Sequence, residues 1–285
     1  MIEMFMRFPG GKDKALTLSY DDGVQTDEEL IRIMKAHGLK GTFNINSGMY
    51  ASEGTVHPQG VYHRRMSKKE AIALYSKSAM EVAVHSLTHP FLEQLTPGAC
   101  CYEVMADRKN LEDDFGTIVR GMAYPYGTYN DEVVKCLRQC GIAYARTVVS
   151  THNFKIPTNW LEMPATCHHN DPKLGELTEH FLTGKVTRQP WLFYLWGHSY
   201  EFERDDNWNV IETFAEKMGN REDIWYATNI EIYDYVQAYQ RLQSSADGKR
   251  LYNPTALTVY YCVNNGKGGW DVHSIQPGQT KELGV

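Results

Sequence analysis

The chain has 285 residues, 42% of them apolar, and a formal net charge of −6 at pH 7. This length and composition fit one large α/β domain, or two small ones, with a sizeable core. The sequence has no basic stripe of the kind that binds nucleic acid, and no apolar run approaches the ~20 residues of a membrane span.

The N-terminal segment does not resemble a signal peptide. Glu3 and Arg7 interrupt any apolar stretch, and a predicted strand follows directly. This favours a cytoplasmic protein, or a secreted one from which a leader has been removed.

The six cysteines form no CxxC pair, which argues against a cysteine zinc knuckle. Cys136 and Cys140 lie four residues apart on a predicted helix, and we interpret them as packed thiols. Free thiols in a reducing compartment are therefore favoured for the whole set. The set is Cys100, Cys101, Cys136, Cys140, Cys167 and Cys262.

Short strand patterns alternate with helical patterns along the chain. Strands are expected at 14–21, 41–46, 80–86, 118–125, 143–148, 160–167, 191–199 and 223–229, and helices at 26–40, 67–78, 96–116 and 130–141. Thr26 with Glu29, and Ser67 with Glu70, should form capping boxes at the first two helices. Repeated strand-then-helix order predicts parallel strands joined by crossover helices, and seven or eight such units favour a closed barrel.

The C-terminal segment departs from this pattern. Residues 240–254 are polar, and residues 255–280 are typical of a β-hairpin that turns at 264–269. We therefore expect a barrel over residues 1–245 and an appendage over residues 246–285 that packs on it.

Unusual polar residues fall where the predicted strands end. Functional groups of parallel barrels cluster at the carboxyl ends of the strands, so these residues should share one mouth. They are Asp21 and Asp22, His85 and His89, the turn at 124–127, and the segments 167–171 and 196–201.

His85 and His89 stand four residues apart, so both imidazoles can reach one metal ion. A pair of this spacing is a weak signal, but the two adjacent aspartates strengthen it. Like charges at the end of a buried strand need a positive partner. Two imidazoles and one carboxylate leave an open position for water, and the second aspartate can then act as general base. The competing interpretation of Asp22-Gly23 is an ordinary turn.

Four motifs, in order, give the chain a resemblance to a known family. They are Ser-Tyr-Asp-Asp-Gly at 19–23, His-Ser-Leu-Thr-His at 85–89, Tyr-Pro-Tyr-Gly at 124–127 and Leu-Trp-Gly-His-Ser at 195–199. Together they resemble the polysaccharide deacetylases of the NodB-homology type, carbohydrate esterase family 4, over roughly residues 12 to 240. The resemblance implies an α/β fold, a distorted (β/α)7-type barrel, here with a short C-terminal β-hairpin extension.

The resemblance assigns a role to each matching residue. Asp22, His85 and His89 would bind a divalent metal; Zn²⁺ suits this ligand set, and Co²⁺, Ni²⁺, Mn²⁺ and Fe²⁺ remain open. Asp21 would be the general base that activates the metal-bound water. The backbone N–H of Tyr126 would help to stabilise the oxyanion, and His198 would be the general acid.

The third motif departs from the family pattern. The family commonly has an arginine where Ala123 stands, and that arginine steadies the catalytic aspartate. Arg146, near the end of the next predicted strand, could replace it. Arg120 is three residues away and is expected to point elsewhere.

The fourth motif, usually an aspartate and a tryptophan that tune the acid histidine, is poorly matched. Asp171 stands at a suitable distance before His198. His168, His169 and Asn170 could contact substrate. The two histidines could also hold a second metal together with Asp171. An exposed polar loop would explain the same residues equally well. Side chains that could line a sugar subsite or simply pack are Tyr200, Glu201, Phe202 and Trp208.

The resemblance implies an enzyme, a hydrolase that removes acetyl groups from an N- or O-acetylated carbohydrate. A small non-sugar amide is a less favoured substrate. A non-catalytic carbohydrate-binding barrel is a further alternative, and the presence of both Asp21 and His198 argues against it. The sequence does not indicate the oligomeric state.

Overall fold

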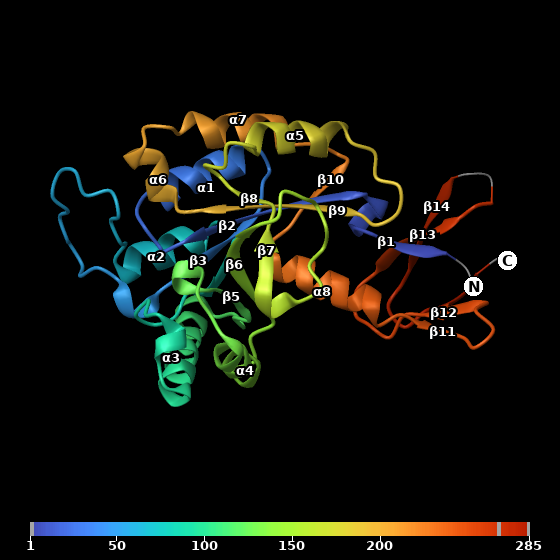
Figure 1. The fold of residues 1–285 in the computed structure, drawn as a ribbon, viewed down its shortest axis with the longest axis horizontal. Coiled ribbons are helices and arrows are strands. Elements are labelled where there is room, and N and C mark those ends of the chain that lie inside the picture. Colours follow the sequence, from blue (N-terminus) through green and yellow to red (C-terminus); the bar gives the residue numbers. More distant parts are fainter. Residues whose placement is uncertain (1–2, 267–268, 284–285) are drawn as a thin grey trace.

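The computed structural model describes residues 3–266 and 269–283, with a parallel sheet at its centre (Figure 1). The strand order is β7-β6-β5-β4-β3-β2-β9-β8, and β10 also pairs with β2. The strands are β2 (Lys14–Asp21), β3 (Gly41–Ile45), β4 (Glu81–Val84), β5 (Gly121–Ala123), β6 (Tyr144–Ser150), β7 (Met163–Ala165), β8 (Cys167–His168), β9 (Trp191–Gly197) and β10 (Ile224–Tyr226).

The two ends of this sheet meet. Only Thr166 separates β7 from β8, so one stretch of chain pairs with β6 on one side and with β9 on the other. The N–H of Thr166 donates to the Tyr194 carbonyl on β9 at 2.8 Å. Strands β3 and β10 share the other edge of β2. The predicted barrel of the (β/α)7 type is thereby confirmed, and the interrupted strand and the shared edge distort it.

Eight helices surround the sheet in the described part of the chain. In Figure 1, α1, α5 and α7 lie along one side of it and α3, α4 and α8 along the other. The four helices expected from the sequence are present as α1 to α4. The helices are α1 (Asp27–Ala36), α2 (Lys68–Tyr75), α3 (Pro97–Phe115), α4 (Asp131–Gln139), α5 (Leu174–Thr183), α6 (Ser199–Arg204), α7 (Asn209–Met218) and α8 (Asn229–Gln240).

None of the helices within residues 3–266 and 269–283 combines the length and the apolar character needed to cross a lipid bilayer.

The two predicted capping boxes have different outcomes. Ser67 and Glu70 exchange the expected hydrogen bonds at the start of α2. At α1 the prediction is wrong, because Thr26 already has a helical backbone and its hydroxyl instead contacts the Ser199 hydroxyl at 2.8 Å. A tertiary contact with α6 thus replaces the local cap.

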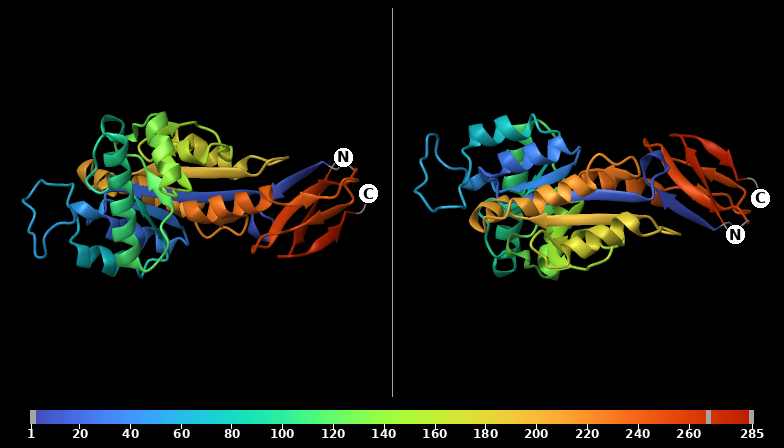
Figure 2. Two further views of the ribbon diagram at one scale, coloured as in Figure 1. Left: turned by 90° about the horizontal axis from the view of Figure 1, so that it is seen from below. Right: turned by 90° about the horizontal axis from the view of Figure 1, so that it is seen from above.

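Both chain ends gather at one end of the molecule in two small antiparallel sheets (Figure 2). The predicted hairpin is present as β13 and β14, although Lys267 and Gly268 of its predicted turn lie outside the described residues. N-terminal β1 completes the hairpin's sheet, and the boundary at residue 245 stays a prediction. The strands are β1 (Met4–Arg7), β13 (Val259–Asn264) and β14 (Trp270–Ile275) in one sheet, and β11 (Gln243–Ser244), β12 (Arg250–Tyr252) and β15 (Thr280–Glu282) in the other.

The hydrophobic core fixes the carboxyl ends of the strands. All eight residues of β2 are buried, and Leu16, Leu18, Phe43 and Val84 belong to one apolar cluster between sheet and helices. Strands buried on both faces cannot shift without exposing apolar surface. Side chains at the ends of β2, β4, β5 and β9 therefore have fixed relative positions.

Candidate active site

The site begins where β2 ends in two buried aspartates. Asp21 is 3% exposed and Asp22 is 6% exposed. Asp22 has a left-handed backbone with a φ of 86°, a conformation that costs free energy for any residue with a Cβ. Of the eight non-glycine residues with positive φ in the described chain, four lie here: Asp22, Ser86, His89 and Tyr126. Strain of this kind persists where the surrounding structure enforces it, which is common at functional sites.

Asp22, His85 and His89 converge on one point. Their ligand atoms lie within 4.8 Å of one another. The Nε2 atoms of His85 and His89 are each 3.8 Å from Oδ1 of Asp22. Sequence spacing predicted this cluster, and the loop after β4 achieves it by the left-handed turns at Ser86 and His89.

The donor set fits a divalent metal. The Nδ1 of His85 lies 2.8 Å from the Ala123 carbonyl oxygen, which can only accept a hydrogen bond, so Nδ1 carries the proton and donates. The Nε2 atom of the neutral ring then has a free lone pair directed at Asp22. Burial lowers the pKa of His89 to about 4 and also lowers the pKa of His85. Both imidazoles are therefore neutral near pH 7, as metal ligands must be.

Two side chains from the loop before α2 also contact Asp22. His63 Nε2 lies 3.0 Å from Oδ2, and Arg65 donates to Oδ1 at 3.1 Å. Burial would raise the pKa of Asp22, but the His63 hydrogen bond and the charges of His85 and Arg65 hold it well below its usual range. Neither His63 nor Arg65 could be predicted as a site residue, because both lie in an irregular loop without periodicity.

Asp21 is held by a different set of partners. Arg146 donates to Oδ2, and the Asn44 amide donates to Oδ1 at 2.8 Å. Oδ2 also lies 3.9 Å from Nε2 of His85 and 3.9 Å from Nε2 of His198. Burial would raise the pKa of Asp21, yet Arg146 and the two histidines lower it, so the carboxylate is ionised at neutral pH.

Strand register explains how Arg146 reaches Asp21. Arg146 on β6 pairs directly with Ala123 on β5, the position at which the resemblance leads one to expect an arginine. Arg146 is 1% exposed, and its guanidinium stacks 4.4 Å from the Trp196 ring centroid. Arg120 instead binds Asp234 at 2.6 Å. The structure thus places the arginine one strand over, at the same height.

His198 stands on the opposite side of the site, directly after β9. Its Nδ1 lies 3.4 Å from Oε1 of Glu201, one turn later on α6. Burial would lower the pKa of His198, but the Glu201 contact and the charge of Asp21 raise it overall. Asp171, which sequence spacing favoured as the tuning carboxylate, binds His152 at 2.7 Å instead. From the sequence, Glu201 was considered only for the sugar subsite. Its position three residues after His198, one helical turn away, could have indicated this contact.

His168 and His169 both approach the other oxygen of Glu201. Each Nε2 lies 3.1 Å from Oε2. The Nδ1 of His168 accepts the Asn170 N–H at 3.1 Å, so the proton of a neutral His168 is carried by Nε2. A protonated Nε2 cannot bind a metal, and Asp171 pairs with His152 instead of with these histidines. Both observations argue against the second metal site considered from the sequence.

Aromatic side chains flank the site differently from expectation. Phe91 and Tyr126 stack with ring centroids 3.9 Å apart, and both are exposed. Tyr126 also meets the His89 ring edge-on at 4.5 Å. Phe202, considered for a sugar subsite, is fully buried, while Tyr200 lies 5.3 Å from the His198 ring. The oxyanion role of the Tyr126 N–H stays a prediction.

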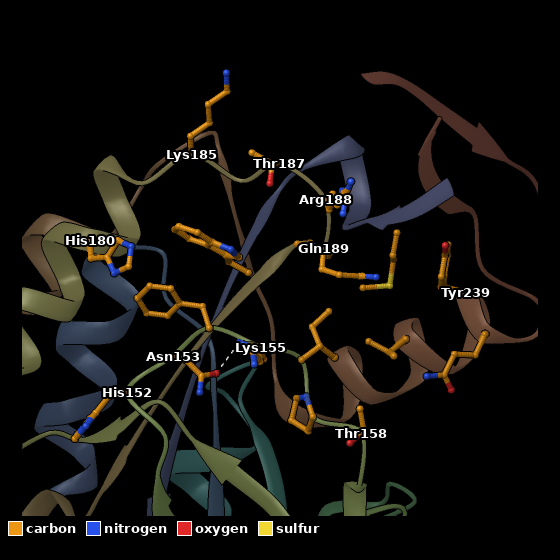
Figure 3. Close-up of a pocket in the computed structure, with 18 residues that line it drawn as sticks. His152, Asn153, Lys155, Thr158, His180, Lys185, Thr187, Arg188, Gln189 and Tyr239 are labelled. Atoms are coloured by element: carbon orange, nitrogen blue, oxygen red, sulfur yellow. Dashed lines mark hydrogen bonds between the residues drawn. The ribbon is translucent and has the colours of Figure 1, made fainter. Parts of the chain in front are cut away.

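A cavity of about 800 Å³ lies away from this site (Figure 3). Its walls include Phe154, Pro190 and Trp191, the last of which begins β9. The cavity therefore opens near the amino ends of the strands, and the residues of the candidate site do not line it.

Comparisons with known proteins bear on the family and the fold of this chain. Residues 9–145 match the family model of polysaccharide deacetylases. YxkH of Bacillus subtilis (strain 168), named as a candidate polysaccharide deacetylase, is 24% identical over 131 residues, which cover 45% of this chain and 43% of YxkH. The match thus spans less than half of that relative.

Two solved structures share the fold. A candidate polysaccharide deacetylase from Mycobacterium smegmatis has a TM-score of 0.58 at 16% identity, covering 82% of this chain and 93% of that one. The peptidoglycan deacetylase PdaC from Bacillus subtilis, in a mutant form, has a TM-score of 0.50 at 14% identity, covering 80% and 94%. At such identities the similarity shows the fold.

Proposed function

We propose that this chain, of which residues 9–145 match the polysaccharide deacetylase family, removes acetyl groups from an N- or O-acetylated carbohydrate in a metal-dependent hydrolysis. One observation carries the proposal. A carboxylate with two neutral imidazoles, a second ionised carboxylate, and a histidine of raised pKa all face one mouth of the barrel.

Asp22, His85 and His89 would hold the metal. Zn²⁺ suits one carboxylate and two imidazoles, and Co²⁺, Ni²⁺, Mn²⁺ and Fe²⁺ are also compatible. When bound, a divalent ion there supplies Lewis-acid chemistry, in that it lowers the pKa of water and polarises the acyl oxygen.

Asp21 is suited to the role of general base. It is ionised, and its Oδ2 points toward both His85 and His198. Arg146 and Asn44 fix the orientation of the Asp21 carboxylate. Held in this way, Asp21 does not act as a metal ligand and remains available to accept a proton. Transfer of a water proton to Asp21 accompanies attack of the water oxygen on the acetyl carbon.

His198 is suited to the role of general acid. The Nδ1 atom of His198 faces Glu201 at 3.4 Å, and its Nε2 atom faces Asp21 and the reaction site. The raised pKa keeps His198 protonated to higher pH than an ordinary histidine. Proton transfer from Nε2 to the leaving amine or alcohol lets the acyl bond break, giving acetate and the free sugar group.

The exposed Phe91–Tyr126 pair supports a carbohydrate over a small amide. Its flat apolar surface lies beside His89, where the ring face of a sugar could rest. Both acetamides and acetyl esters pass through a tetrahedral intermediate, so these residues serve either bond.

Acetate release tests the proposal. Metal-reconstituted protein would be incubated with acetylated chitooligosaccharides, peptidoglycan fragments and acetylated xylan, each with and without chelator. We expect chelator-sensitive release from one of these classes. Release that chelator leaves unchanged would contradict the metal role, and no release from any class by metal-loaded protein would contradict the carbohydrate assignment.

A further inference from the structure

A group of thiols lies apart from the active site, between helices α3 and α4. The Sγ atoms of Cys101, Cys136 and Cys140 lie within 4.8 Å of one another. Cys136 and Cys140 are 3.8 Å apart, sulfur to sulfur. The packed-thiol interpretation of this pair did not anticipate that a cysteine from another helix joins it.

The spacing of these sulfurs fits a metal site better than a disulfide. Zn–S bonds of about 2.3 Å in a tetrahedral site place two sulfurs about 3.8 Å apart. A disulfide holds two sulfurs at about 2.05 Å and leaves a third without a partner. All six cysteines, each within the described chain, are free in this structure.

Rigid elements hold the three sulfurs. Cys136 and Cys140 lie one helical turn apart at the end of α4, and Cys101 lies near the start of α3. The two helices contact each other beneath the sheet, as Figures 1 and 2 show. Ligands on helices are positioned more accurately than ligands on loops.

Burial raises the pKa of the Cys136 and Cys140 thiols, so only a bound cation would hold them as thiolates. Cys136 and Cys140 are 3% and 5% exposed, while Cys101 is half-buried and gives an ion a way in. Arg108 donates to the Cys140 carbonyl at 2.7 Å, which brings a positive charge beside the cluster.

We propose that Cys101, Cys136 and Cys140 form a second metal site, a structural one that binds a thiophilic divalent ion such as Zn²⁺. Binding replaces three S–H bonds by three metal–sulfur bonds and releases three protons, so affinity rises with pH.

The bound ion would clamp α3 to α4. The clamp has a route to the active site, because Asp107 on α3 accepts the backbone N–H of His85 at 3.0 Å. Its role is nevertheless distinct from catalysis, since the two sites share no ligand and have different ligand chemistry.

Cobalt substitution distinguishes the two sites. Co²⁺ bound to thiolates gives an intense charge-transfer absorption in the near ultraviolet, and Co²⁺ bound to one carboxylate and two imidazoles does not. We expect the reduced protein to bind two equivalents of Co²⁺ and to show this absorption. The double variant Cys136→Ser/Cys140→Ser should lose the absorption and one equivalent of metal.

Three further variants sharpen the test. Cys262→Ser, a buried cysteine of β13 outside the cluster, should keep both equivalents and the absorption. His85→Ala should lose one equivalent and keep the absorption, which separates this site from the proposed catalytic metal. If the double variant does not fold, the half-buried Cys101→Ser replaces it, with folding checked by circular dichroism.

Absence of the absorption in the reduced wild-type protein would overturn the proposal. Its persistence in the cysteine variants would do the same. Fewer than six titratable thiols in protein denatured without reductant would also overturn it, because a disulfide would then occupy these sulfurs.

Discussion

The two halves of the active site are built by different means. The half with Asp21, Asp22, His85 and His89 comes from short motifs at the ends of β2 and β4, and left-handed backbone turns aim its side chains. The half with His198 takes its shape from a side-chain network centred on Glu201.

This difference sets how each half should respond to substitution. In the first half, each side chain has a separate partner and a separate task, so single changes should cause large and specific losses. In the second half, three histidines share one carboxylate, so changes around His198 should act through its pKa and orientation.

The largest effect in the second half should follow His198→Ala. Loss of a general acid should lower kcat by about 10²- to 10⁴-fold with little change in KM. Steady-state kinetics on the substrate identified by acetate release would measure this. A kcat within about tenfold of wild type would assign the acid role to another group.

Arg146→Met should rank next. The change removes the cation that holds Asp21 and should lower kcat by about 10- to 100-fold, as is typical for residues that orient groups at a metal site. Arg120→Met is the matched control, because Arg120 pairs with Asp234 on the outside of the barrel. Equal losses in both variants would show that the Arg146 effect reflects general destabilisation.

Glu201→Gln should shift the pH dependence. The Glu201 contact raises the pKa of His198, and a general acid is lost as the pH rises through its pKa. Removing the charge lowers that pKa, so the basic limb of the kcat profile should move to lower pH, with a loss of about tenfold at neutral pH. Asp171→Asn should leave the profile unchanged. A basic limb that does not shift in Glu201→Gln would show that Glu201 does not raise the pKa of His198.

Phe91→Ala should have the smallest effect. Loss of an aromatic contact worth about 0.5–1.5 kcal/mol should raise KM for a carbohydrate about 2- to 10-fold. Hydrolysis of a small activated acetyl ester, which has no sugar ring to rest on Phe91, should be unaffected. A parallel loss on both substrates would show that Phe91 supports His89 and not the sugar.

The sequence predicted that Asp22, His85 and His89 lie together, as they do in the structure, but not the His63 and Arg65 contacts to Asp22. The residues of the first half carry the chemistry in contiguous motifs, and strand patterns placed those motifs at the ends of buried strands. The barrel followed from the same strand–helix order, whereas the interrupted strand at Thr166 depends on pairing that no local pattern encodes.

The second half could be predicted only in part. The separation along the sequence favoured Asp171 as the carboxylate beside His198. In the structure, Asp171 pairs with His152, and the carboxylate beside His198 is Glu201, one helical turn later. The sequence alone left open whether Arg146 contacts Asp21, because that contact depends on the register of β5 and β6, which pairs Arg146 with Ala123. Side-chain networks across strands and loops depend on tertiary structure and leave little trace in a single sequence.

The central claim is that two adjacent aspartates divide the work, with Asp22 for metal and Asp21 for the proton. Metal content and acetate release should be measured together in Asp21→Asn and Asp22→Asn. We predict that Asp21→Asn keeps the wild-type metal content and loses turnover, while Asp22→Asn loses the active-site metal and turnover together. Full activity in Asp21→Asn, or unchanged metal content in Asp22→Asn, would contradict this division.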